Sequence, residues 1–180
     1  NLAVEALQKL LKDEVRVRFG VNVVKTGQFS ELIEAALLSY RNGTIEAAQV
    51  IEELIAIAKK MQNSEVETAA LGLSEDEALF YDALIVNGSA KEVMNDDQLR
   101  DLARVLVQQV RNDATIDWQV RERVQAKLKV NVKKTLQKYG YPPDQQALAT
   151  SLVLEQAKAY GDTWSKKESY QAGGGASLID

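Results

Sequence analysis

Hydrophobic side chains recur at helical spacing along most of this chain. In the clearest stretch, Leu99, Leu102, Ala103, Leu106 and Val110 follow one another at intervals of three or four residues, which places them on one face of a helix. Glycine and asparagine interrupt the pattern and divide it into about seven helices, over roughly 1–18, 28–41, 45–61, 75–87, 95–112, 118–139 and 144–160. Apart from the brief segment 21–24, no strand pattern occurs, and no repeat of fixed period is present. The sequence therefore predicts an all-α fold, a single compact bundle-like helical domain.

Three helix starts carry a local signature. Ser74 with Glu77, and Asn95 with Gln98, have the spacing of a capping box, in which each side chain accepts a hydrogen bond from the other residue's backbone N–H. Asp117 can cap the helix that follows it. These signatures predict helix boundaries at 74, 95 and 117.

The domain organisation follows from where the periodicity holds. Residues 1–161 form one helical domain, with 1–20 as a connecting helix and 62–72 as a polar connection. The helical pattern is already present at Asn1, and the chain has no initiator Met, so we expect a piece of a longer polypeptide. Residues 162–180 lose the pattern and contain three consecutive glycines, which predicts a flexible tail.

Composition and motifs limit the chemistry. The 180 residues include no cysteine and no histidine, which excludes a thiolate nucleophile, a cysteine zinc site and a histidine general base. The chain has no phosphate-binding glycine loop, no nucleophile elbow and no apolar run that could span a membrane. The carboxylates at 75–77 and 96–97 fall in first helical turns, where they complement the helix dipole, so we expect no metal site.

Charge is unevenly distributed along the chain. The formal net charge is −4, but ten of the 22 Lys and Arg residues and only four of the 26 acids lie between 100 and 140. That segment carries +6 and the rest of the chain −10, an asymmetry that suggests a polyanion as partner. We expect phosphate attraction from nine of these cations: Arg100, Arg104, Arg121, Arg123, Lys127, Lys129, Lys133, Lys134 and Lys138.

The helix at 118–139 holds most of those cations on two flanks of one apolar stripe. Arg123, Lys127, Lys134 and Lys138 lie on one flank, and Lys129 and Lys133 lie on the other. A row of cations along a rigid helix can follow DNA phosphates, although a solvated helix face has the same pattern. No aromatic residue is interleaved on the basic face, so base stacking is not indicated.

Aromatic residues at helix ends are interpreted first as packing anchors. Trp118, Tyr139 and Tyr141 lie at such positions. The segment Tyr141-Pro142-Pro143 is a rigid connection that fixes the angle between the last two helices. An exposed tyrosine there could also be a docking point for a partner.

Several segments together resemble the C-terminal region of type I restriction enzyme motor (R) subunits. Residues 73–84 (LSEDEALFYDAL) carry the resemblance most clearly. It continues through Trp118, 126–128 (AKL), 132–133 (VK), Leu136, 139–144 (YGYPPD) and 153–157 (VLEQA), and an earlier helix matches from Phe29 to Asn42. Many relatives have arginine where Lys129 stands, so this position keeps the charge but loses bidentate phosphate recognition.

The resemblance implies a role that the residues alone do not give. An R subunit is an ATP-driven DNA translocase and endonuclease of the cytoplasm, which assembles on a core of methyltransferase and specificity subunits. Its nuclease and helicase motifs are absent here, so ATP and Mg²⁺ belong to the parent protein and this domain has no cofactor and no activity of its own.

We therefore expect a non-catalytic domain that aids assembly with the methyltransferase core and contacts duplex DNA, with no membrane partner. One alternative is a purely structural cap on the helicase core. Another is an accessory enzymatic or nucleotide-binding site in a carboxylate-lined cleft.

Overall fold

The computed structural model describes residues 1–114 and 117–173, with side chains as far as Trp164. Every regular element in these residues is helical, which confirms the all-α prediction. The elements are α1 (Leu2–Phe19), α2 (Val23–Arg41), α3 (Ala47–Ala70), α4 (Glu75–Ile85), α5 (Ser89–Val93), α6 (Asp96–Asp113), the 3₁₀ turn η1 (Trp118–Val120), α7 (Glu122–Lys138), the 3₁₀ turn η2 (Pro143–Gln145) and α8 (Gln146–Gly173).

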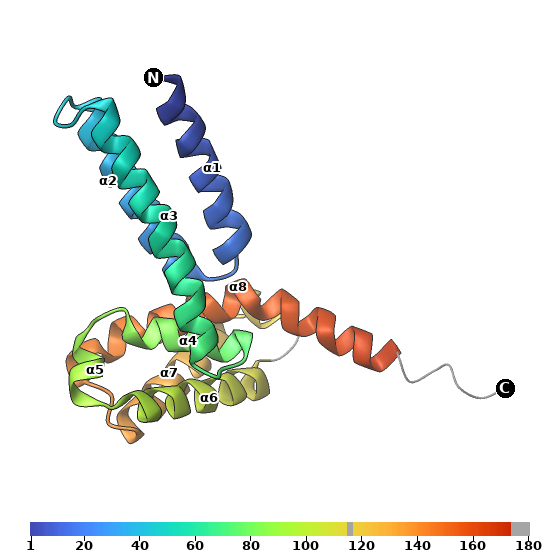
Figure 1. Ribbon diagram of the computed structural model, residues 1–180. Helices are drawn as coiled ribbons and strands as arrows, with labels where there is room; N and C mark the ends of the chain where they lie inside the picture. Colours follow the sequence, from blue (N-terminus) through green and yellow to red (C-terminus); the bar gives the residue numbers. More distant parts are fainter. Residues whose placement is uncertain (115–116, 174–180) are drawn as a thin grey trace.

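The first three helices form an elongated arm, which we define as α1–α3 (Figure 1). Its own hydrophobic core is built from side chains at helical spacing, because each helix turns one apolar stripe inward. Val50 and Leu54 of α3 are fully buried there, and Phe19 stacks on Phe29 with ring centroids 5.1 Å apart.

The other helices form the head, which we define as α4–α8 with its two 3₁₀ turns. A second hydrophobic core fills it, with Phe80 of α4, Leu102 and Leu106 of α6, and Leu136 of α7 fully buried. The described side chains thus form two hydrophobic cores, one in the arm and one in the head, and Val24 of α2 packs into the second.

Buried polar side chains join the arm to the head. Gln156 of α8 accepts a hydrogen bond from the Val23 N–H at 2.9 Å and donates one to the Val21 carbonyl at 2.6 Å, so it holds the turn between α1 and α2. Asn22 in that turn caps α2 by accepting from the Lys25 N–H and donates to Asp82 of α4 at 2.8 Å. These bonds fix the base of the arm on the head.

The capping boxes at Ser74 and Asn95 are confirmed, and Gly140 ends α7 with a positive φ of 77°. Asp117 makes no side-chain cap; it has a φ of 63° and precedes η1, so α7 begins only at Glu122.

The helices differ from the sequence prediction in four further places. Segment 21–24 is the start of α2 rather than a strand, and α5 is an additional short helix. The polar connection predicted at 62–72 is wrong, because α3 continues to Ala70. Helix α8 continues past Gly161 to Gly173, so residues 162–173 are helical where a tail was predicted, and 174–180 lie outside the described residues.

Candidate functional site

Helix α7 packs on the head through one apolar stripe and exposes the rest of its surface. Leu128, Val132 and Leu136 are buried. On one edge of this stripe, Thr135 donates a 2.6 Å hydrogen bond to Gln109 of α6, and Asn131 donates a 3.2 Å bond to Asp113. These bonds fix the rotation of α7, and with it the directions of its basic side chains.

The cations of the first row, which we define as Arg123, Lys127, Lys134 and Lys138, are exposed and lie beside the α6 edge. Lys127 and Lys134 are four residues before and three residues after Asn131, so they share its side of the helix. Asp113, held by Asn131, is the acid beside this row. Within residues 1–114 and 117–164, no acidic side chain forms an ion pair with any first-row cation, so their charge faces solvent.

The second row, which we define as Lys129 and Lys133, lies on the opposite flank of α7. Lys129 lines a cleft of about 470 Å³ between α7 and α8, together with Glu122, Glu155 and Lys158. Two acids and two bases line this cleft, so Lys129 lies among charges of both signs. Lys133, four residues further on, is exposed on the same flank. Arg121 is exposed and precedes α7 at its N-cap.

The structure separates Arg100 and Arg104 from α7. Arg100 donates to the Leu71 carbonyl at 3.2 Å and pairs with Asp96 and Asp97, and Arg104 pairs with Asp101 at 2.8 Å. On α6 these two arginines lie on the face opposite to Gln109, which contacts α7. Of the nine cations expected to attract phosphate, Arg100 and Arg104 therefore do not share a surface with the α7 cations.

Tyr141 is an internal anchor rather than a docking point. It is 2% exposed, and its hydroxyl donates a 2.6 Å hydrogen bond to the Leu84 carbonyl. Burial raises the pKa of Tyr141 to about 12, with a smaller contribution from Asp144. Pro142 is buried as well, and only Pro143, which opens η2, is exposed. Of the three residues predicted as a docking point, only Pro143 therefore lies at the surface, and Tyr141 packs inside the head.

The acidic turn at 75–77 has internal partners. The Asp76 carboxylate accepts hydrogen bonds from the Ser74 hydroxyl at 2.6 Å, the Trp164 indole at 3.1 Å and the Glu77 N–H at 3.0 Å. Burial opposes ionisation, but these bonds, aided by Arg111, outweigh it and lower the pKa of Asp76. No group of acids able to hold a metal ion occurs among the described residues.

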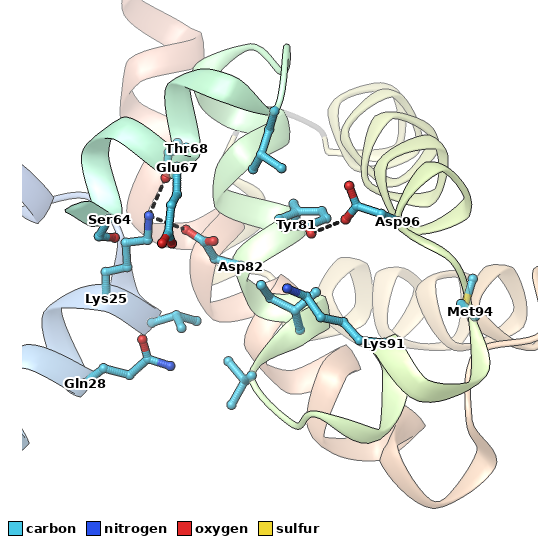
Figure 2. Close-up of a pocket in the computed structure, with 14 residues that line it drawn as sticks. Lys25, Gln28, Ser64, Glu67, Thr68, Tyr81, Asp82, Lys91, Met94 and Asp96 are labelled. Atoms are coloured by element: carbon cyan, nitrogen blue, oxygen red, sulfur yellow. Dashed lines mark hydrogen bonds and ion pairs between the residues drawn. The ribbon is translucent and has the colours of Figure 1, made fainter. Parts of the chain in front are cut away.

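A cleft of about 610 Å³ lies where the arm meets the head, and sequence reasoning missed it (Figure 2). Lys25 points into it and lies 3.5 Å from Asp82, while its amine also donates to Thr68. Burial raises the pKa of Asp82, and Lys25 and Asn22 partly offset that effect. On another wall Tyr81 donates to Asp96 at 2.5 Å.

These contacts pair Lys25, Asp82 and Tyr81 within the protein and link α2 to α3 and α4, so we interpret the cleft as the joint between arm and head. The signal for it was present in the sequence: Asp82 is a lone acid inside the apolar run 78–85, and such a residue needs a buried partner.

Comparisons with known proteins agree with the resemblance seen in the sequence. Residues 1–162 match the family model described as "Type I restriction enzyme HindI endonuclease subunit-like, C-terminal". The chain is 36% identical over 158 residues to the type I restriction enzyme HindI endonuclease subunit of Haemophilus influenzae, covering 88% of this chain and 15% of that protein. It is 31% identical over 142 residues to the putative MjaIXP endonuclease subunit of Methanocaldococcus jannaschii, covering 76% of this chain and 13% of that protein.

The chain therefore spans about a seventh of the length of these curated relatives. No solved structure matches it significantly. None of the described helices is long and apolar enough to cross a membrane.

Proposed function

This chain belongs to the family of C-terminal domains of HindI-like type I restriction enzyme endonuclease subunits, and on that premise we propose that it contacts the backbone of duplex DNA through α7. One observation carries the proposal. The cations of α7 are exposed and have no acidic partner within residues 1–114 and 117–164, whereas eight of the 14 other cations in those residues form ion pairs.

Counterion release explains why unpaired cations matter. Each Lys or Arg that neutralises a phosphate releases a condensed counterion, which favours binding at moderate salt. A cation already paired with a carboxylate must lose that partner first. We therefore assign the phosphate contacts to the first row of α7. Arg121 and the second row are unpaired among the described side chains but lie off that row, and Arg100 and Arg104 are already paired with acids.

The contact is independent of sequence. The exposed face of α7 between Arg123 and Lys138 has no aromatic side chain to stack on bases. Contacts to phosphates position a protein on DNA but read no base. Sequence recognition is then left to another part of the restriction complex.

We also propose that the domain aids assembly of the endonuclease subunit with the methyltransferase and specificity subunits. One observation favours this role: Leu2, Leu10 and Val17 on α1 are 84%, 62% and 79% exposed and lie on one side of the arm. Exposed apolar side chains that share one helix face are a feature of protein interaction surfaces. ATP and Mg²⁺ belong, in this proposal, to the rest of the endonuclease subunit in the cytoplasm, and this domain is not itself catalytic.

Assembly is tested in the complete endonuclease subunit with Leu10→Gln and Val17→Gln together. We expect less methyltransferase to co-purify with this variant. Val93→Gln in the head is the matched control, because Val93 is 66% exposed on α5, and it should leave co-purification unchanged. Unchanged co-purification of the α1 variant would reject the assembly role.

DNA contact is tested by fluorescence anisotropy with a labelled duplex of about 30 base pairs at fixed salt. Changing all four first-row cations to glutamine should weaken binding at least 30-fold. Lys59→Gln with Lys60→Gln on α3, both exposed, removes charge from the arm and should change affinity less than twofold. Equal affinity of the first-row variant and the unmodified chain would favour the alternative, a structural cap on the helicase core without DNA contact.

A further inference from the structure

The four first-row cations fall into two pairs. Arg123 and Lys127 are four residues apart, and so are Lys134 and Lys138. Because an α-helix rises about 1.5 Å per residue, the members of each pair are separated by ~6 Å along the axis, and the inner members by ~10.5 Å.

The gap between the pairs is not itself a binding element. Val130, which is 52% exposed, and Asn131, whose side-chain amide donates to Asp113, lie in the gap. Neither Val130 nor Asn131 carries a charge, and Asp113 beside Asn131 is negative. The cations of the first row therefore form two groups with an uncharged gap between them.

This spacing resembles the distance between phosphate strands across a groove of B-DNA. The major groove is about 12 Å wide and the minor groove about 6 Å. The ~10.5 Å gap between Lys127 and Lys134, extended by the reach of two long side chains, fits the major groove and exceeds the minor groove. Each pair, ~6 Å long, can then rest on one rim.

We propose that α7 spans the major groove from rim to rim, with Arg123 and Lys127 on the phosphates of one strand and Lys134 and Lys138 on those of the other. The second row, Lys129 and Lys133, takes no part. Lys129 lines the α7–α8 cleft, where Glu122 and Glu155 oppose a phosphate, and Lys133 follows it by four residues on the same flank. This inference rests on the proposed DNA contact and specifies its geometry.

Three double variants, each of which removes two charges from α7, test the assignment of the rows. They are Arg123→Gln/Lys127→Gln, Lys134→Gln/Lys138→Gln and Lys129→Gln/Lys133→Gln. Duplex affinity is measured by anisotropy between 50 and 200 mM salt. Either first-row variant should reduce the log–log salt slope by about 1.8, at ~0.9 per phosphate contact, and the second-row variant should leave it unchanged. An equal reduction by the second-row variant would overturn the inference.

The need for two strands is tested with DNA of the same length in single-stranded form. Groove spanning predicts at least tenfold weaker binding of the single strand at equal salt, because one pair of cations then lacks its strand. Equal affinity for single-stranded and duplex DNA would overturn the groove-spanning inference, but it would leave the proposed DNA contact in place. If the unmodified chain bound neither form, the proposed function itself would fail. Thermal unfolding of every variant, expected to match the unmodified chain, confirms that the fold is intact.

Discussion

The arm and helix α7 use the same basic residues in opposite ways. In the arm, Lys12 pairs with Glu34 at 2.9 Å, and Arg18 pairs with Glu14 at 2.6 Å and with Glu65 at 2.9 Å. In α7, the segment Glu122–Lys138 holds six Lys and Arg residues and one acid. No ion pair involves these cations within residues 1–114 and 117–164. Lys12 and Arg18 thus hold arm helices to one another, whereas we propose that the first-row cations of α7 act on a partner outside the chain.

The difference originates in the sequence. Along α1, acids alternate with bases at spacings of three and four residues, so intrahelical pairs form. Along α7, no acid stands three or four residues from any of the six cations. Net charge therefore says little about function until the positions of the partners are known.

The largest loss of stability is expected at Lys25, the most buried paired cation of the arm. Asp82→Ala should lower the free energy of unfolding by about 4 kcal/mol, because it leaves the Lys25 amine buried without its counter-charge. Chemical denaturation measures this. The double variant Lys25→Met/Asp82→Leu should recover most of the loss, since apolar replacements of a buried pair are tolerated. A loss below ~1 kcal/mol in the single variant would show that the pair does not secure the joint.

The head also contains a paired cation. Arg111 lies 4.0 Å from the Asp76 carboxylate, so substitution of Asp76 shows what such a partner contributes there. Asp76→Asn should lower the unfolding free energy by about 1.5 kcal/mol at pH 7, since hydrogen bonds to an ionised group are weakened. The folded pKa of Asp76 is lowered, so its contribution is complete above the pKa of an unfolded aspartate, about 3.9, and is lost as pH falls below that value. Denaturation curves from pH 7 to pH 3 should therefore converge for the two proteins. If the unfolding free energies of the unmodified chain and the Asp76→Asn variant differed by the same amount at every pH, the lowered pKa of Asp76 would be contradicted.

The smallest effects come from a matched pair of surface substitutions. Arg18→Gln should cost about 1 kcal/mol of stability, because it removes two partly exposed ion pairs, and should leave DNA affinity unchanged. Lys127→Gln should leave stability within ~0.3 kcal/mol and weaken duplex binding several-fold. Denaturation and anisotropy on both variants measure the four quantities. If both variants lost stability alone, the distinction between inward and outward cations would be wrong.

Features set by neighbouring residues were predictable from the sequence. The capping box at Ser74 and Glu77 needs only three residues of spacing, and the Ser74 N–H donates to Glu77 at 2.9 Å as expected. The apolar stripe of α6 is buried for the same reason, because helical periodicity alone determines which residues share a face. The basic flanks of α7 follow from that periodicity too.

Features that depend on distant partners were not predictable. The polar end of α3 resembles a loop in sequence, but Glu65 and Thr68 there contact Arg18 and Lys25, which stabilises the helix to Ala70. The continuation of α8 past Gly161 places Trp164 on Asp76, a contact across 88 residues. Likewise, nothing near Arg100 in sequence indicates the Leu71 carbonyl that fixes its direction.

The most direct test of the account is the salt dependence of duplex binding by the unmodified chain. If the four first-row cations each neutralise one phosphate, the logarithm of the association constant should fall with the logarithm of salt concentration at a slope of about −3.6. A slope near zero, or no binding at 50 mM salt, would contradict the claim that the cations of α7 act on DNA.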